Sequence, residues 1–363
     1  MGGGIGGLAA AVALRARGAN VVVYERSRRE KQGVALLVWG NAVKALATLG
    51  VADDLLRVAT PIEVTRVRDP RGELLAELPI GEWSKCAEMP TVTARRSDVL
   101  RVLAAKLAPD VVQEGCDLVA MEQLRGHVGL RFSDGSHDEV DALVGADGVS
   151  SIVRAQLLDD GPPRAVNQQA WVGWVAMRGE PGTATATVGR GPRFWSAPLA
   201  DGVFWYATMN GTGERRDLLA TMKGWHEPIA TLIEGTREED VVATWVRDRP
   251  PASRWGNGHV TLLGDAAHPC TPDLGQGACQ AIESAVVLAT SLARASSIEA
   301  GLRVYERLRM ERTAVVTRLC WLTSVNSTIE SPALCSVRDA AIRLGLRSVA
   351  RGHLEWILRG QPC

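Results

Sequence analysis

The sequence predicts an α/β protein, α+β overall, in which a doubly wound domain contains an inserted antiparallel sheet and is followed by C-terminal helices. Three observations support this prediction. A glycine-rich turn, a helical segment and a β-branched strand open the chain. Short aromatic segments separated by Gly, Pro and Asp turns fill residues 163–254. From about Trp255 a buried strand and long apolar helical segments return, so the second unit interrupts the first.

The part of the chain before residue 163 alternates helical and strand patterns. The helical segments expected there are 8–17, which ends at Gly18, then 41–50, and 97–107 with Ser97 as its N-cap. The strands expected there are 20–25, a continuous β-branched run, followed by 116–124, 128–136 and 138–148, with a hairpin turn at Asp134-Gly135. Such alternation is typical of βαβ units.

The rest of the chain sets the expected domain boundaries. Aromatic strands are expected at 170–180, 191–199 and 202–211, then a buried strand at 259–269 and helices at 277–295, 298–324 and 334–357. We therefore expect a discontinuous first domain at 1–162 and 255–330. The second domain is expected at 163–254, with a contribution from about 60–95, and a C-terminal helical segment at 331–363.

Composition argues against several classes of protein. The 41 basic and 41 acidic residues cancel, so nothing points to nucleic acid or to an anionic membrane surface. No apolar run reaches the roughly 18 residues of a membrane span, and no signal peptide opens the chain, so we expect a cytoplasmic protein. The seven cysteines are scattered without a C-x-x-C pair, so we expect neither a metal site nor a disulfide framework.

The first motif with chemical meaning is the opening turn. Gly2, Gly4 and Gly7 fit G-x-G-x-x-G, which places a dinucleotide pyrophosphate at a helix N-terminus. Glu25 ends the following strand, where a carboxylate accepts hydrogen bonds from ribose hydroxyls. The same carboxylate would repel a 2′-phosphate. The turn therefore predicts bound FAD or NAD rather than NADP.

Two further motifs lie later in the chain. In "LLGDAAHPCTPDLGQGACQAIESA", Asp265 at a strand end can bind a polyol, and Gly275 opens a helix whose free N–H groups favour negative charge. In "VGADGVSSIVR", Asp147 and Gly148 are followed by Ser151 and Arg154. This last motif has two interpretations, a nucleotide contact or a plain strand-to-helix turn with an N-cap.

Together these motifs resemble the single-component FAD-dependent aromatic hydroxylases of the p-hydroxybenzoate hydroxylase superfamily, over nearly the whole chain. "ARRSDVLRVL" is similar to the family's R-x-D-L segment, with Arg96 facing the flavin, and "YERLRMER" resembles its Tyr-Glu-x-x-Arg helix. The sequence after Gly264 resembles most closely that of the urate hydroxylases and zeaxanthin epoxidases, except that Ser284 stands where that branch usually has Asp. The cofactor-binding residues implied are Gly2, Gly4, Gly7, Glu25, Arg96, Leu118, Asp147, Gly148, Asp265, Pro272, Gly275, Gln276, Gly277 and Ala278.

The resemblance implies an activity. NADPH or NADH would reduce FAD, and O₂ would then give a flavin hydroperoxide that hydroxylates or epoxidises a small aromatic or polycyclic substrate. The alternatives are a related flavoprotein reductase or halogenase, or a truncated non-catalytic relative. "WVGWVAM" does not supply the W-x-W-x-I-P segment of the halogenases. The resemblance leaves a monomer and a homodimer equally open.

Candidate catalytic and substrate residues are fewer. Arg178 and His268 are weak catalytic candidates, since the first suits a surface ion pair and the second suits a loop-shaping role. The substrate candidates are Trp174, Trp195 and Trp205, on the inserted sheet. Adjacent residues of a strand point to opposite faces, so only some of these rings can face a substrate.

The opening turn raises one further expectation, because only Met1 precedes it. The first strand of a doubly wound sheet is central and usually about 5–6 residues long. Burial of about four aliphatic side chains there is worth roughly 6–12 kcal/mol. We therefore expect the chain as written to fold poorly or hold FAD weakly, and its true start to lie upstream. A degenerate enzyme is the alternative.

Overall fold

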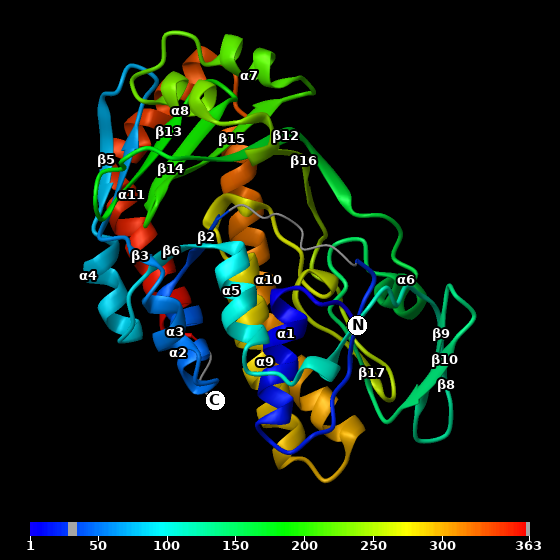
Figure 1. Cartoon of the computed structure of the whole chain (residues 1–363). Coiled ribbons are helices and arrows are strands. Elements are labelled where there is room, and N and C mark those ends of the chain that lie inside the picture. Colours follow the sequence, from blue (N-terminus) through cyan, green and yellow to red (C-terminus); the bar gives the residue numbers. More distant parts are fainter. Residues whose placement is uncertain (28–34, 361–363) are drawn as a thin grey trace.

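The computed structural model describes residues 1–27 and 35–360 and has two layers of structure joined by long helices (Figure 1). In the lower layer, helix α1 (Ile5–Arg15) packs against α5 (Arg96–Ala104) and α9 (Gly277–Arg294). Beside them lie two parallel strand pairs, β1 (Val23–Glu25) with β7 (Val112–Glu114) and β11 (Leu143–Gly145) with β17 (Val260–Leu262). Buried aliphatic residues of these elements form the largest hydrophobic core.

Met1 and Gly2 lie between the two parallel pairs. The Gly2 N–H donates to the Tyr24 carbonyl at 2.8 Å, and the Ala146 N–H donates to the Met1 carbonyl at 2.8 Å. Glycine is required at Gly2 and Gly7, because a Cβ would lie 2.4 Å from the Ala146 oxygen and 1.9 Å from the Gly2 oxygen, respectively. The tight turn of the motif is therefore formed. The expectation of a missing first strand stays a prediction.

The upper layer is a seven-stranded sheet in the order β16-β12-β15-β14-β13-β4-β5. Its strands are β4 (Val64–Arg68), β5 (Leu74–Leu78), β12 (Arg164–Val175), β13 (Thr183–Val188), β14 (Arg193–Leu199), β15 (Gly202–Asn210) and β16 (Val241–Asp248). All neighbours are antiparallel except β13 and β4, which are parallel. One face, called here the outer face, packs on α7 (Arg215–Thr221) and α8 (Ile229–Gly235). The opposite, inner face lies toward the lower layer (Figure 1).

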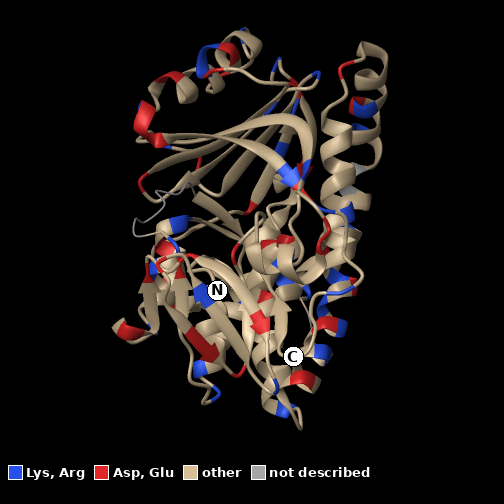
Figure 2. Ribbon diagram, turned by 90° about the vertical axis from the view of Figure 1, so that its right-hand side faces the viewer, with Lys and Arg blue, Asp and Glu red and all other residues tan. Residues whose placement is uncertain are grey.

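Two long helices complete the chain. They are α10 (Ile298–Ser327) and α11 (Pro332–Leu358), and α10 runs from the lower layer to the sheet (Figure 1). Among residues 1–27 and 35–360, no helix is long and apolar enough to cross a membrane. In the view of Figure 2, acidic and basic residues are interspersed over both layers. The predicted mixed α/β fold with multi-stranded sheets and C-terminal helices is confirmed.

Smaller elements surround this frame. Two three-stranded sheets are β2 (Ala35–Val38), β6 (Val92–Arg95) and β3 (Thr60–Pro61), and β10 (His137–Val140), β9 (Val128–Phe132) and β8 (Leu118–Gln123). The remaining helices are α2 (Gly40–Thr48), α3 (Ala52–Leu56), α4 (Ile80–Ser84) and α6 (Ile152–Leu158), and the 3₁₀ turns are Lys85–Ala87, Pro109–Val111, Glu238–Asp240, η4 (Gly264–Ala266) and η5 (Pro272–Leu274).

Two local predictions were wrong. The N-cap of α5 is Arg95 and not Ser97, and no side chain caps the helix, because the chain turns helical directly from β6. The strand expected at 138–148 is two strands, β10 and β11, that belong to different sheets. The predicted turn at Asp134-Gly135 is correct, since the Gly135 N–H donates to the Phe132 carbonyl at 3.1 Å between β9 and β10.

Candidate active site

The start of α1 is built to receive an anion. Gly4 is its N-cap, with no side chain capping the helix and no acidic residue in the first turn. A Cβ at Gly4 would meet nothing within 4 Å, so the backbone is open to close approach. Unpaired N–H groups and the positive end of the helix dipole therefore face accessible space. A pyrophosphate fits this position.

Glu25 lies beside this turn. Its Oε2 accepts from the Gly3 N–H at 2.6 Å and its Oε1 from the Ser27 N–H at 2.8 Å. The two hydrogen bonds fix the carboxylate at the end of β1, next to the glycine turn. This is where a ribose diol would lie if the pyrophosphate occupied the start of α1.

Arg96 brings the first and second motifs together. It is half-buried at the start of α5, and burial lowers its pKa while the charges of Asp265 and Glu25 act to raise it. Asp265 lies in η4, and its side chain is accessible to solvent. The protein atoms around the carboxylate displace part of its water and so raise its pKa, while the positive charge of Arg96 acts to lower it. The guanidinium thus interacts with the charges of two carboxylates that are 240 residues apart in the chain. That charge pattern suits a ligand with both phosphate and polyol groups.

The start of α9 forms a second helix N-terminus in the same region. Gly275 adopts a left-handed φ of +61°, and a Cβ at Gly277 would lie 3.7 Å from Asp265 Oδ1. Gln276 is fully buried and its Nε2 has no hydrogen-bond partner in the structure. Pro272 is exposed at the start of η5, and Ala278 is half-buried. The Gln276 amide oxygen accepts from Asn41 and Gln280, so the amide nitrogen is the unpaired atom. This donor beside free helix N–H groups fits a hydrogen-bonding ring system.

The Asp147–Arg154 motif contacts the loop that carries Asp265. The Asp147 carboxylate accepts from Ser151 Oγ at 2.6 Å and from the Ile152 N–H at 2.8 Å. The buried Arg154 donates from Nη1 to the carbonyls of Ala266 and Ala267, both at 2.9 Å. The N-cap of α6 is Ser151, whose Oγ accepts from the Arg154 N–H at 2.8 Å, so the motif forms a capped strand-to-helix turn, and the nucleotide contact of Asp147 stays a prediction. Arg154 holds the loop that carries Asp265. Gly148 has a φ of +84° with open space beside it, and Leu118 is a buried core residue at the start of β8.

The Tyr-Glu-x-x-Arg segment of α10 anchors the strand and helix on either side of that loop. The Tyr305 hydroxyl donates to the Leu262 carbonyl at 3.0 Å, and Glu306 accepts from Thr261 Oγ1 at 2.6 Å. Arg309, with no exposed surface, donates to Glu283 at 2.7 Å, and Arg312 donates to the same carboxylate at 3.1 Å. Burial would raise the pKa of Glu283, but the two arginines outweigh it and lower the pKa. Helix α9 is therefore fixed to α10 by a buried ion cluster.

Ser284 completes this cluster at the position where the motif comparison finds Asp. Its hydroxyl accepts from Arg309 Nε at 3.0 Å and lies 3.3 Å from His268 Nε2. His268 is buried and packs on Trp255 with ring centroids 5.4 Å apart. Burial, followed by the charge of Arg309, lowers the pKa of His268 to about 3. His268 is thus a neutral, loop-shaping residue at neutral pH.

This assignment predicts a pH dependence of stability. The unfolded histidine binds a proton near its ordinary pKa of about 6.5, whereas folded His268 does not until about pH 3. The contribution of neutral His268 to the free energy of unfolding is therefore fully present above pH 6.5. It falls by about 1.4 kcal/mol per pH unit as the pH drops below that value. His268→Gln should remove about 2 kcal/mol of the loss between pH 6.5 and 5. Urea unfolding at both pH values measures it, with exposed His137→Gln as the control, and equal losses in both variants would contradict it.

A polar cluster on the inner face of the sheet was not predicted from the sequence. Arg193 of β14 forms a buried ion pair with Asp273 of η5 and donates from Nε to Thr208 Oγ1 at 3.0 Å. The Tyr206 ring centroid is 6.0 Å from the guanidinium. Burial would lower the pKa of Arg193, but Asp273 and Tyr206 outweigh it and raise the pKa. Burial raises the pKa of the Tyr206 hydroxyl, which therefore stays protonated.

Several polar atoms of this region are buried without a hydrogen-bond partner in the structure. They are Arg193 Nη2, Tyr206 Oη, Asp273 Oδ2 and Thr271 Oγ1. Buried polar groups are normally satisfied, so a concentration of unsatisfied ones marks a site that another molecule completes. The sequence signal that could have found it is a single arginine at the start of an aromatic strand.

The tryptophan candidates divide between the two faces. Trp174 and Trp195 pack on the inner side with Ala35 and Phe204, and the Arg95 guanidinium lies 4.1 Å from the Trp174 ring centroid. Trp205 is fully buried on the outer face and donates from Nε1 to Thr236 Oγ1 at 2.8 Å. Its placement among α7 and α8 puts it behind the sheet. Arg178 is exposed in the bend after β12.

Comparison with known proteins decides what these features belong to. A family model described as an FAD binding domain matches residues 1–322. The chain is 34% identical to the aurachin C monooxygenase/isomerase of Stigmatella aurantiaca, over 94% of this chain and 92% of that protein. It is 33% identical to the FAD-dependent urate hydroxylase of Klebsiella pneumoniae, over 86% of this chain and 85% of that protein. The chain belongs to the FAD-dependent aromatic hydroxylases.

A solved structure supports the same conclusion for the hydroxylase fold. Klebsiella pneumoniae HpxO complexed with FAD and uric acid aligns with a TM-score of 0.92 and 28% identity, covering 98% of this chain and 95% of that one. The family resemblance predicted from the motifs is therefore confirmed, and FAD is the cofactor of this hydroxylase.

The position of Asp265 in this hydroxylase gives a direct test. Asp265→Ala should weaken FAD binding while leaving the fold largely intact, because it removes a solvent-accessible acceptor and not core packing. A hydrogen bond to a charged group is worth about 1.5–3 kcal/mol, so affinity should fall roughly 10- to 150-fold. Fluorescence titration of FAD measures it, with exposed Asp134→Ala as the matched control. Equal FAD affinity in the two variants would rule out the assigned contact.

Proposed function

We propose that the protein is an NADPH- or NADH-dependent monooxygenase that uses O₂ to hydroxylate or epoxidise a small aromatic or polycyclic molecule. The observation that carries the proposal is the Arg193–Asp273 pair with its unsatisfied neighbours, which joins the inner face of the sheet to the loop that leads into the start of α9. Relatives named for aromatic substrates support it, among them a 6-hydroxynicotinate 3-monooxygenase and a 3-amino-4-hydroxybenzoate 2-monooxygenase.

In this proposal the cofactor lies along the first two motifs. The start of α1 holds the pyrophosphate, Glu25 the adenosine ribose, and Asp265 with Arg96 the ribityl chain. The start of α9 lies at the ring, where the helix dipole stabilises negative charge. When bound, FAD supplies the redox chemistry with O₂.

The substrate lies under the inner face of the sheet. Arg193 Nη2 and the protonated Tyr206 hydroxyl donate to an oxygen or ring nitrogen of the substrate, and Asp273 Oδ2 accepts from one of its N–H or O–H groups. The half-buried Trp195 offers an apolar surface beside these polar atoms. The pattern favours a flat substrate with polar groups on one edge.

The experiment is an assay of the FAD-loaded protein with NADH or NADPH in air. Urate, aurachin C, 6-hydroxynicotinate and 3-amino-4-hydroxybenzoate form the first panel. The expected result is faster pyridine nucleotide oxidation with one of them, together with a product that has gained one oxygen atom by mass spectrometry. Stimulated oxidation that yields only hydrogen peroxide across a wide panel of aromatic compounds, with no oxygenated product, would contradict the proposal.

A further inference from the structure

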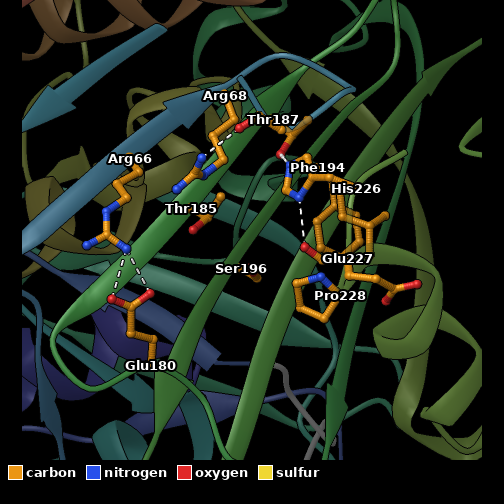
Figure 3. Close-up of a pocket in the computed structure, with 12 residues that line it drawn as sticks. Arg66, Arg68, Glu180, Thr185, Thr187, Phe194, Ser196, His226, Glu227 and Pro228 are labelled. Carbon is orange, nitrogen blue, oxygen red and sulfur yellow. Dashed lines mark hydrogen bonds and ion pairs between the residues drawn. The ribbon is translucent and has the colours of Figure 1, made fainter. Parts of the chain in front are cut away.

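A cavity lies on the outer face of the sheet, away from the site described above. It has a volume of about 330 Å³, within the usual size of small-molecule sites, and is lined by β4, β13, β14 and the segment before α8 (Figure 3). Strand register arranges its wall in two rows. Arg66 is opposite Thr185, which is opposite Ser196, and Arg68 is opposite Thr187, which is opposite Phe194.

The two arginines of this cavity differ in their partners. Arg66 is neutralised, because its Nη1 lies 2.8 Å from both oxygens of Glu180 and its Nε lies 3.3 Å from Glu77. Arg68 donates from Nη1 to the Gly72 carbonyl at 2.6 Å and has no carboxylate partner among residues 1–27 and 35–360. The carboxylate of Glu227 accepts from Thr231 at 2.9 Å and lies on the far side of the cavity from Arg68 (Figure 3). Arg68 is therefore the guanidinium of this lining without a carboxylate partner, and the Glu227 carboxylate, which balances its charge over the cavity as a whole, lies away from it (Figure 3).

The rest of the lining is polar near the arginines and apolar opposite them. The hydroxyls of Thr185 and Ser196 make no hydrogen bond within the described part of the chain, and both lie between the arginines and the far wall (Figure 3). That far wall contains Phe194, Pro228 and the ring of His226, whose Nε2 lies 2.9 Å from Thr187 Oγ1. Hydrogen-bond donors at one end and apolar groups at the other suit a molecule with an acceptor group at one end and an apolar body at the other.

We propose that this cavity binds a small organic acid with one carboxylate and an apolar or aromatic body. The carboxylate pairs with Arg68 and accepts hydrogen bonds from Thr185 and Ser196, and the body lies against Phe194 and Pro228. The single unpaired guanidinium and the apolar wall favour an organic monoacid over inorganic phosphate.

The acid site is separate from the substrate site, although both use β14. Arg193 and Trp195 point to the inner face, whereas Phe194 and Ser196, the residues that alternate with them, line the cavity on the outer face. An acid bound outside would therefore contact the strand that carries Arg193 without entering the substrate site.

Calorimetric titration of the FAD-loaded protein with benzoate tests the proposal without using activity. Arg68→Gln should weaken benzoate binding at least about 10-fold, the lower bound for a hydrogen bond to a charged group. The matched control is Arg71→Gln, since Arg71 is exposed, pairs with Asp69 and is outside the cavity. Thr185→Val, which removes one hydroxyl at constant size, should weaken binding by a smaller factor with no loss of thermal stability.

Two further arms identify the site and the ligand class. Benzoate binding should persist in Arg193→Gln, and benzamide, the neutral analogue, should bind at least about 10-fold more weakly than benzoate. Loss of benzoate binding in Arg193→Gln but not in Arg68→Gln would place the acid in the substrate site and overturn the proposal. Inorganic phosphate that displaced benzoate at equal concentration would overturn the organic-acid assignment, as would benzoate affinity unchanged by Arg68→Gln.

Discussion

Replacing Arg309 with methionine should lower the free energy of unfolding by about 3–5 kcal/mol, the usual cost of removing one partner from a buried ion pair. Glu283 would lose a hydrogen bond of 2.7 Å, and Gln280 Oε1 would lose another of 2.7 Å. Both residues belong to α9, so FAD affinity should fall with stability. Urea unfolding and FAD titration measure the two effects.

The control for this variant is Arg307→Met, on the exposed side of the same helix. It should change stability by less than about 0.5 kcal/mol, as surface substitutions usually do. A second variant, Arg312→Met combined with Arg309→Met, leaves the buried Glu283 carboxylate without an arginine partner and should be less stable than Arg309→Met alone. Equal stability of Arg309→Met and Arg307→Met would mean that the ion cluster does not hold α9.

Replacing Arg193 with glutamine should lower kcat/KM for the aromatic substrate roughly 10- to 150-fold, while FAD affinity stays within a factor of about 2. The first figure corresponds to one hydrogen bond to a charged group, about 1.5–3 kcal/mol. Arg193 is on the sheet and the residues proposed to bind the cofactor are in the lower layer, so the two effects should separate. Steady-state kinetics and FAD titration on the same preparation measure them.

The matched control is Arg190→Gln, an exposed residue in the turn before β14. Because Arg193→Gln leaves Asp273 buried with a weaker partner, thermal unfolding of both variants is needed to separate folding from catalysis. Arg193→Lys, which keeps the charge but loses the planar fork, should restore part of the activity. Full activity of Arg193→Gln would show that the Arg193–Asp273 cluster does not bind the substrate.

The family and its FAD cofactor were predictable because the motifs that indicate them are local in the chain. Gly2, Gly4 and Gly7 follow from the steric needs of a tight turn, and Glu25 follows from its place at a strand end. Short-range spacing fixes such residues, so little information about distant contacts is needed. Arg96 was singled out by the family resemblance alone, and its guanidinium interacts with the charges of Asp265 and Glu25.

The substrate half was not predictable in the same way. Arg193 and Asp273 are 80 residues apart, and their contact depends on the register of β14 against β15 and on the position of η5. Alternation along a strand separates Trp205 from Tyr206, but it does not say which of the two faces the cofactor side. The choice is made by α7 and α8, whose apolar residues cover the outer face.

Helix α10 also limits how the molecule can move. Its 30 residues span about 45 Å, and its first half is bonded to β17 through Tyr305. Near its other end, Trp321 stacks on Arg164 of β12 at 3.4 Å, and the carbonyl of Thr328, the residue after its last turn, accepts from Asn210 of β15 at 3.1 Å. A hinge between the two layers would have to bend this rod or break its contacts at one end. We therefore expect substrate to enter and product to leave through movements of loops and side chains, with the two layers remaining a single rigid body throughout turnover.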